Sequence, residues 1–498
     1  MKRVYLLVVA VFSIFTYATA QNVDDALRYS QIFYGGTARF MSMGGAFTAL
    51  GGDISSLSQN PAGIGVFRAS ELTITPQLFQ IKTTAGFNGT SINNLSNFNL
   101  NQIGIVSNLI STSKETGLMS LNIGYSFNRT NNYNQSVLIK GVNNSSSMAD
   151  YWAALGNQNG GISYNNLSGA EQNAFDAWLM DTVTGSGGKN YATAFSNYGD
   201  NPPSKYGQTV RRLISNEGTS GEHAFSIGGN YSNKLFFGAT IGISTVSYTS
   251  HYEHLESVNT PLISQLSNFT YTDHFEDKGT GYSIKLGAIF KPVDAVRIGL
   301  AFHSPTWYRF NEYFYNDLST HFTDGGHYDF STTADRFRYK LATPYRLLAG
   351  VGVQIQKIAL IDVDYEYVDY SSSKFSNLGD TYDYSDKNME IKNSLQAASS
   401  IRIGGELRLN KLYLRSGYGY YGKAFKSNED NANLDYTSLS FGAGFREQNI
   451  SIDFGYTNIK YSQKYFLYPV DLGVEPAVSD LSTVRSMFTL TIGYKFGI

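Results

Sequence analysis

The sequence predicts an all-β protein: a transmembrane antiparallel β-barrel of about fourteen strands, with an N-terminal plug inside its lumen. Three observations lead to this fold class. The chain begins with a secretory signal, its later segments alternate apolar and polar residues, and its connections alternate between short and long. A membrane barrel combines these features because each strand shows lipid only every second residue and needs no long apolar run.

The first predicted element is a signal peptide over residues 1–20. Lys2 and Arg3 precede an apolar run at residues 4–15, and small residues suited to cleavage stand at 18–20. This order of basic, apolar and small residues is typical of secretory signals. The apolar run is too short to span a bilayer as a helix. We therefore expect a mature chain from residue 21, exported to the cell outer membrane of Gram-negative type.

The composition excludes several other classes. Charged residues make up 16% of the 498 residues and aromatic residues 14%, whereas soluble domains carry about 25% charged residues. A net charge of −2 gives no reason to expect a nucleic-acid partner. The absence of cysteine removes disulfides, thiolate metal sites and cysteine nucleophiles. Beyond the signal, no stretch approaches twenty apolar residues, so a helical membrane protein is excluded.

Alternation is clear along the predicted barrel, residues 69–498. From residue 118 to 128, apolar side chains at odd positions alternate with Ser, Asn and Gly. Similar segments begin near residues 235, 282, 361, 401, 450 and 488. A soluble sandwich would alternate in the same way. The secretory signal and the aromatic Phe496 near the end of the chain favour the barrel, whose apolar face meets lipid.

The connections provide the strand count. Short ones at 232–233, 292–294, 356–357, 410 and 448 alternate with long polar ones near 86–97, 142–221, 311–335, 371–388, 427–434 and 468–480. The even count of about fourteen requires one long third strand, interrupted at Asn131, Asn132, Tyr133, Asn134 and Gln135. Within the long extracellular loop at 142–221, residues 147–155 and 170–180 have helical spacing, which predicts a structured cap.

Residues 21–68 precede the first strand and do not alternate, so we expect them to fold into the lumen as a plug, or hatch. Their distinctive residues are Gly44, Gly45, Asp53, Asn60, Pro61 and Ala62. This pattern resembles the hatch signature of the FadL-type outer-membrane transporters of long-chain fatty acids and hydrocarbons. Segments at 297–305, 343–344 and 402–406 resemble the same family.

The resemblance implies passive outer-membrane transport of long-chain fatty acids or similar hydrophobic molecules. In that family a ligand is caught outside, passes to a site in the lumen, and leaves sideways at a kink in the third strand once the hatch moves. The interruption at 131–135 lies in the predicted third strand and is the candidate lateral opening. The alternative is that this strand rises above the membrane, where irregularity is harmless.

An anion in a low-dielectric lumen needs a cationic partner, and the candidates for a fatty-acid carboxylate are Arg297, Arg346, Arg402 and Arg415. The alternative is a salt-bridge network, formed with lumenal acids such as Asp364 and Glu366, that holds the plug.

Other functions have weaker support. No nucleophile stands in a suitable motif, so we expect no catalytic residues and no enzyme. The glycines at 417–422 match dinucleotide spacing without the required helix. His321 and His327 share one extracellular loop, which leaves a haem receptor open, and a structural or adhesive surface barrel is a further alternative. We expect no cofactor and no metal, a monomer, and contacts with outer-membrane lipid and lipopolysaccharide.

Overall fold

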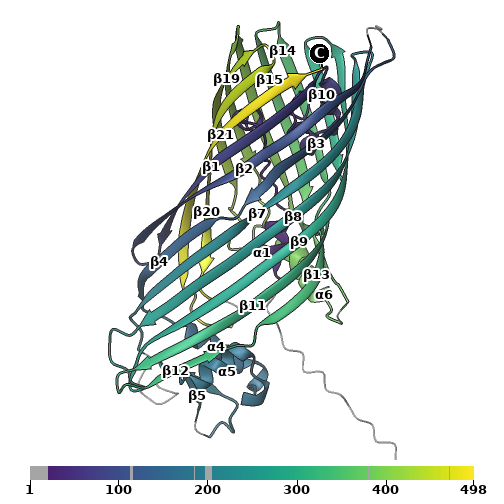
Figure 1. The fold of residues 1–498 in the computed structure, drawn as a ribbon. Helices are drawn as coiled ribbons and strands as arrows, with labels where there is room; N and C mark the ends of the chain where they lie inside the picture. The colour runs from purple at the N-terminus through teal and green to yellow at the C-terminus, as the bar shows by residue number, and fades with distance from the viewer. Residues whose placement is uncertain are drawn as a thin grey trace, which may run out of the picture.

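The computed structural model describes residues 21–112, 116–183, 185–196, 205–379, 381–469 and 472–497. The predicted signal peptide, residues 1–20, lies outside these ranges. The described chain forms a long barrel of tilted strands around an N-terminal helical segment (Figure 1). All strand pairs are antiparallel, and β21 pairs with β1, which closes the barrel.

The barrel has fourteen wall strands, as predicted, because four of them are divided into two pieces in line. The divided strands are β3 with β4, β10 with β11, β13 with β14, and β15 with β16. The wall pieces are β1 (Ser70–Gly86), β2 (Thr90–Ser111), β3 (Leu118–Asn132), β4 (Gln135–Asn143), β7 (Gln208–Tyr231), β8 (Leu235–Ser257), β9 (Leu266–Val293), β10 (Val296–His303), β11 (Trp307–Phe322), β13 (Asp335–Ala342), β14 (Arg346–Ile355), β15 (Ala359–Asp369), β16 (Lys374–Asn377), β17 (Ala397–Leu409), β18 (Leu412–Tyr421), β19 (Tyr436–Glu447), β20 (Ile450–Phe466) and β21 (Val478–Phe496).

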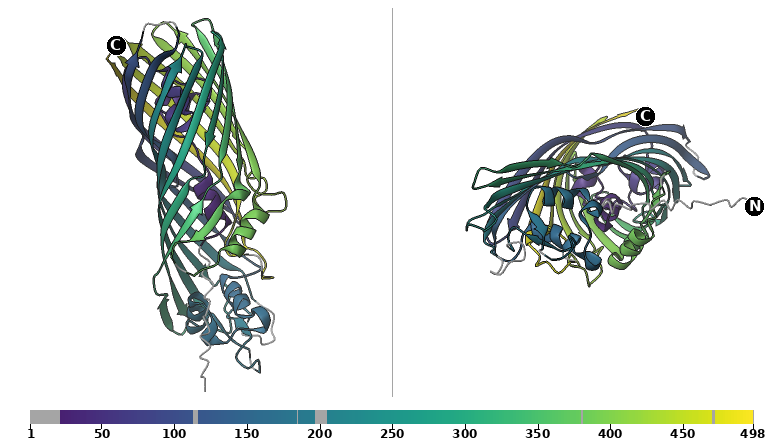
Figure 2. Two further views of the ribbon diagram at one scale, coloured as in Figure 1. Left: turned by 90° about the vertical axis from the view of Figure 1, so that its right-hand side faces the viewer. Right: turned by 90° about the horizontal axis from the view of Figure 1, so that it is seen from below.

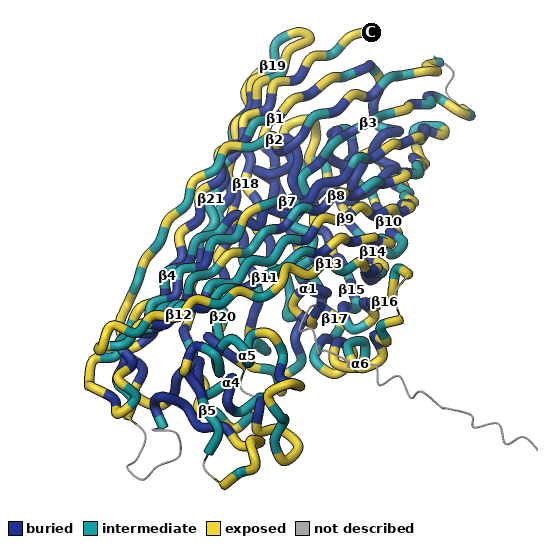
Figure 3. Tube along the Cα trace, turned by 60° about the horizontal axis from the view of Figure 1, so that its bottom comes forward, coloured by how far each residue is buried: buried dark blue, intermediate teal, exposed yellow. Residues whose placement is uncertain are grey.

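Alternation in the sequence becomes alternation between the two faces of the wall (Figure 3). Ile123, Phe225 and Ile241 stand exposed on the outer face, whereas Asn122 and Thr240 are buried in the lumen. This reverses the arrangement of a soluble sandwich and suits a wall that faces lipid. Within the described ranges, no helix is long and apolar enough to cross a membrane.

The strands extend further than predicted: β11 continues to Phe322 inside the loop predicted at 311–335, and two other loops are also shorter than predicted. The predicted loop at 86–97 is only a turn at 87–89, because β2 already begins at Thr90. The loop predicted at 142–221 spans only 144–207, because β7 begins at Gln208. In both cases the ladder of backbone hydrogen bonds continues through polar sequence, such as Glu217, that carries no apolar signal.

The long loop folds into a cap at the end of the barrel where the long connections lie (Figure 1). The two predicted helices are confirmed as α4 (Met148–Gly156) and α5 (Gly169–Asp176). α5 ends earlier than expected, since Trp178 has a φ of 60°. Further short elements are η2 (Gln158–Gly160), η3 (Tyr164–Asn166), β5 (Met180–Thr182) and β6 (Tyr191–Thr193) in the cap, with β12 (His327–Ser331), η5 (Tyr370–Ser372) and α6 (Ser385–Ser394) elsewhere.

The hatch, residues 21–68, lies inside the ring of strands (Figure 2, right). It contains α1 (Val23–Ser30), α2 (Ala38–Ser42), α3 (Ser56–Gln59) and η1 (Pro61–Val66). α1 is fixed to the wall by Tyr29, which donates a hydrogen bond of 2.6 Å to Asp277 and stacks on Phe310. Burial and the Asp277 carboxylate raise the pKa of Tyr29 well above its usual range, so its hydroxyl keeps the proton that it donates.

Candidate functional site

The residues of the predicted hatch motif fix the backbone conformation of the hatch through hydrogen bonds and turns. Asn60 is fully buried; its Nδ2 donates to the Thr48 carbonyl at 2.6 Å, and its Oδ1 accepts from the Ala62 amide at 3.0 Å. It thereby caps η1, in which Pro61 occupies the first position. Asp53 accepts a bond of 2.8 Å from the Thr37 hydroxyl. Gly44 and Gly45 both have positive φ in the turn that follows α2.

The hatch contacts the inner face of the wall at glycine residues of the strands. A Cβ added at Gly287 would lie 1.9 Å from Asn60 Oδ1, closer than real Cβ contacts. Gly238, Gly299, Gly404 and Gly417 meet hatch backbone in the same way. Glycine in a strand often marks such a close approach of a second chain segment.

All four arginines predicted as ligand cations form ion pairs or hydrogen bonds inside the lumen. Arg346 and Arg402 both pair with Glu366, at 2.6 and 2.7 Å. Arg415 pairs with Glu406 and Asp453, and Arg297 donates to the Leu50 carbonyl of the hatch at 2.6 Å. Only Arg402 also lines the pocket described next, and its Nε and Nη2 have no partner in the described part of the chain.

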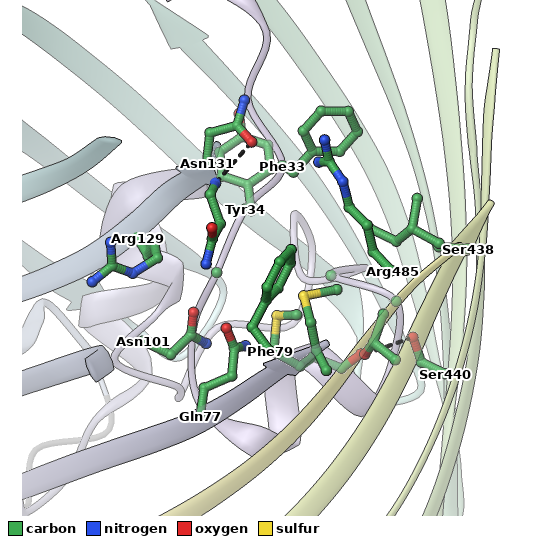
Figure 4. A pocket seen from close by; sticks show the side chains of 18 of the residues that line it. Phe33, Tyr34, Gln77, Phe79, Asn101, Arg129, Asn131, Ser438, Ser440 and Arg485 are labelled. Carbon is green, nitrogen blue, oxygen red and sulfur yellow. Dashed lines mark hydrogen bonds between the residues drawn. The ribbon is translucent and has the colours of Figure 1, made fainter. Parts of the chain in front are cut away.

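A narrow pocket lies between the hatch and the wall (Figure 4), and the space in it that a water molecule can occupy is about 50 Å³. Its apolar lining comes from both sides, with Phe33 and Met41 from the hatch and Phe79, Ile459 and Met487 from the wall. Aromatic and thioether side chains of this kind suit an apolar ligand.

Arg485 of β21 stands at the edge of this pocket, beside Phe33 (Figure 4). Its guanidinium lies 5.8 Å from the Phe33 ring and 5.0 Å from the Tyr461 ring, and its Nη2 donates to the Tyr461 hydroxyl at 3.0 Å. Among the described residues, no carboxylate forms an ion pair with it, and its buried Nε has no partner. Arg485, like Arg129, which also lines this pocket, is therefore a cation available to an anionic group from outside the protein.

A second and larger cavity, with an empty volume of about 1990 Å³, lies around α1 and is lined by polar residues such as Asp25 and Arg28. Phe33, Asn131 and Arg485 line both this cavity and the smaller pocket. The two spaces therefore adjoin at these residues.

The wall has a gap beside the smaller pocket. β3 pairs with β2 only between Gln102 and Ser111, and β4 pairs only with β7. Residues 90–100 of β2 thus have a ladder partner, β1, on one side only. We call the space between residues 95–100 and residues 129–134 the wall gap. Towards the cap it ends where Asn93 donates to Ser136 at 2.8 Å.

The predicted interruption at 131–135 coincides with this gap. Tyr133 and Asn134 separate β3 from β4, whereas Asn131 and Asn132 still belong to β3 and Gln135 begins β4. The strand pairing with β7 continues on both sides of the break. At this irregularity β3 separates from β2 while it stays paired with β7. The separation coincides with a register shift in the β3–β7 pairing between Arg129 and Asn131.

The hatch fills the wall gap with residues 33–36. The amides of Phe33 and Gly35 donate to the carbonyls of Thr130 and Arg129, both at 2.8 Å, and Asn101 Nδ2 donates to the Gly36 carbonyl at 2.6 Å. A Cβ at Gly35 would lie 2.5 Å from Asn101 Oδ1, so only glycine fits here. These bonds satisfy strand groups that would otherwise be unpaired against lipid.

Arg129 spans the outer side of the same gap. Its Nη2 donates to the Leu100 carbonyl of β2 at 3.0 Å, and its Nη1 has no partner in the described ranges. Sequence reasoning missed Gly35, Asn101, Arg129 and Arg485. A signal existed for Arg485, because residues 481–494 contain no other charged residue. The gap follows only from strand pairing.

The remaining candidates come together differently. His321 and His327 are opposite each other on β11 and β12, with their Nδ1 atoms 2.6 Å apart and His327 Nε2 2.6 Å from Asp329. This arrangement leaves no room for an iron between the two rings. No group of three or more His, Asp or Glu arranged for a metal occurs in the described ranges.

Comparisons with known proteins found one matching family model and several solved barrels of similar fold. The family model described as outer membrane protein transport protein (OMPP1/FadL/TodX) matches residues 187–496. A FadL homologue from Pseudomonas aeruginosa has a TM-score of 0.57 at 12% identity, covering 94% of this chain and 100% of its own. The P. putida toluene transporter TodX has a TM-score of 0.52 at 13% identity, covering 93% and 99%. At these identities the two structures establish the fold alone. No curated protein matches the sequence.

Proposed function

The chain belongs to the OMPP1/FadL/TodX family of outer membrane transport proteins, and on that premise we propose that it carries long-chain fatty acids passively through the wall gap. Membership makes it an outer-membrane transporter of the hydrocarbon-carrying family and not an enzyme. The proposal adds the substrate, its route and the part that opens.

One observation carries the proposal: hatch residues 33–36 occupy the wall gap, and Phe33, Tyr34 and Gly35 also line the pocket. A ligand entering this pocket contacts the same segment that blocks the exit. A ligand that binds at Phe33 more tightly when the segment is displaced therefore raises the population of the displaced state.

The ligand class follows from the pocket. Its apolar lining suits a hydrocarbon chain, and Arg485 offers an unpaired charge for one carboxylate. A neutral hydrocarbon, such as the toluene carried by TodX, would leave that cation unsatisfied. Long-chain fatty acids match both features.

In this route the ligand first enters the larger cavity around α1. It then moves past Asn131 into the smaller pocket. Displacement of residues 33–36 then opens the gap, and the ligand leaves sideways into the bilayer. No energy source is required, because the hydrocarbon chain moves from water into lipid.

The test is uptake of radiolabelled oleate by cells that express the chain. Asn101→Ala removes the tie to Gly36, whereas Asn94→Ala changes the same residue type on the same strand at an exposed position outside the wall gap. We expect Asn101→Ala to change the uptake rate by roughly fivefold, the value of one hydrogen bond worth about 1 kcal/mol. Asn94→Ala should match the unaltered chain.

Two outcomes would count against the proposal. Uptake no higher than in cells without the chain would refute fatty-acid transport. Uptake that is equal in both variants, with correctly folded barrels, would refute the gate at residues 33–36.

A further inference from the structure

The outer face of the wall carries a polar row beside the wall gap. Arg129, Phe127 and Tyr125 follow one another on the outer face of β3, and His223 stands opposite Phe127 on β7. Tyr125 and His223 share a hydrogen bond of 3.0 Å between the hydroxyl and Nδ1. The Phe127 ring lies 5.1 Å from the His223 ring and 6.0 Å from the Arg129 guanidinium.

Ionisable groups on a lipid-facing surface are costly and mark function by default. The neighbouring outward positions on β7 are Phe225 and Ile227, both about half exposed, which is the usual composition of this wall. The row is thus a local exception, and it begins at the residue that borders the gap.

An apolar groove continues from the row, away from the gap. It has an empty volume of about 990 Å³ and is lined on its outer side by Ile105, Ile123, Phe225, Ile227, Ile241 and Ile284. Ala239 of β8 contributes the small side chain at which the groove can be deep. From Arg129 to Ile123 the strand advances six residues, a length of about 20 Å.

We infer that this groove receives the transported carboxylate as it leaves the wall gap, with the head group at Arg129 and the Tyr125–His223 pair and the hydrocarbon chain along the groove. The inference rests on the proposed function and names the place where the ligand first meets the bilayer.

Three observations favour this occupant. The groove lies next to the gap, because Tyr125 lines the groove and Arg129, four residues further along the same face of β3, borders the gap. The charge is complementary, since Arg129 Nη1 has no hydrogen-bond partner in the described part of the chain. The order of groups along the wall, first a cation and then apolar side chains, complements a fatty acid, which is a carboxylate followed by a hydrocarbon chain.

The site also has a physical role. A carboxylate that entered the bilayer directly would lose its partner in low dielectric, which is costly. Transfer from Arg485 inside to Arg129 outside lets the head group exchange one cation for another while the chain moves into lipid.

The experiment uses palmitate that carries a photoreactive diazirine near the end of its chain. Ala239→Phe fills the groove, and Ala443→Phe makes the same change at an outward position on β19, away from the gap. Cells expressing each chain receive the probe, are irradiated, and the labelled peptides are mapped by mass spectrometry. Palmitate uptake is measured in parallel.

We expect the label to concentrate on the outer faces of β3, β7 and β8 in the unaltered chain and in Ala443→Phe. In Ala239→Phe the labelling of these strands and the uptake rate should both fall severalfold. A barrel that shifts normally on a gel after heating shows that each variant is folded.

Equal labelling of the two variants, or label spread evenly around the wall, would overturn the inference while leaving transport intact. Groove labelling that excess unlabelled palmitate does not reduce would assign the groove to a resident membrane lipid, which overturns it as well. Absence of uptake in the unaltered chain refutes the proposed function itself, and groove labelling would then reflect binding from the bilayer and not receipt from the gap.

Discussion

Replacing Asn60 by alanine should release the hatch from its seat without unfolding the barrel. The side chain is fully buried and makes three hydrogen bonds, to the Thr48 carbonyl, to the Ala288 carbonyl of the wall at 3.4 Å, and from the Ala62 amide. Alanine removes all three of these bonds inside the lumen. Each such loss costs about 1–3 kcal/mol, and the helix cap is among them.

Taken together, the losses amount to about 3 kcal/mol, which raises the population of the displaced hatch by roughly 100-fold. The barrel ladder does not pass through Asn60, so the wall should keep its stability.

Cysteine labelling measures this population directly, because the chain has no cysteine of its own. Ala49 of the hatch is fully buried, and Ala49→Cys provides a reporter. A water-soluble maleimide reacts with it only when the hatch opens, at a rate that follows the open population when reclosing is fast. We expect reaction roughly 100-fold faster in the Asn60→Ala background.

The control is Asn428→Ala, at an exposed loop position. A labelling rate within a factor of about three of the control would refute the reasoning, since a change that small corresponds to less than 1 kcal/mol. The hatch would then be held by its glycine contacts and ion pairs, with Asn60 contributing little.

Three further predictions concern separate parts of the molecule. Arg485→Leu should weaken oleate binding by about 10- to 100-fold, the value of a charge-assisted hydrogen bond, and leave binding of a neutral alkane unchanged; equal losses for both ligands in a calorimetric titration would contradict a head-group role. Gly287→Ala should displace the hatch as Asn60→Ala does, because its new Cβ would lie 1.9 Å from Asn60 Oδ1, whereas Gly405→Ala meets nothing closer than 3.8 Å and should label at the normal rate. Burial raises the pKa of Asp150 in the cap to about 6, so protonation favours the folded cap: this contribution is fully present below about pH 4 and is lost as the pH rises through 6. Limited proteolysis of the cap should accordingly be faster at pH 7.5 than at pH 5, and a difference that persists in Asp150→Asn would show that another group is responsible.

Much of the fold could be predicted because it depends on local patterns. Alternation over residues 118–128 places Ile123 outside and Asn122 inside whatever the neighbouring strands are. The fourteen-strand count also followed from the chain, since turn lengths fix parity in a closed barrel. The polar extensions of β2 and β7 could not be predicted, because a strand whose two faces are both wet has no apolar period.

In the candidate site, too, some residues could be identified from the sequence, whereas the roles of others depend on distant contacts. Asn60 and Pro61 were singled out by their resemblance to the family's hatch signature, and the structure shows that Asn60 caps the short helix that begins at Pro61. The roles of Arg346, Arg402 and Arg415 could not be predicted, because each depends on which acid stands across the lumen, such as Glu366 on another strand.

The barrel, its strand count, the position of the hatch and the break in the third strand could be predicted because they arise from the period, spacing and adjacency of residues. The role of the break depends instead on contacts between segments that are distant in the chain. The wall gap exists because β3 departs from β2, and it is closed by residues 33–36, nearly a hundred residues away in the chain. Such contacts depend on strand register and on the path of the hatch through the lumen, and neither quantity is encoded in any local pattern of residues.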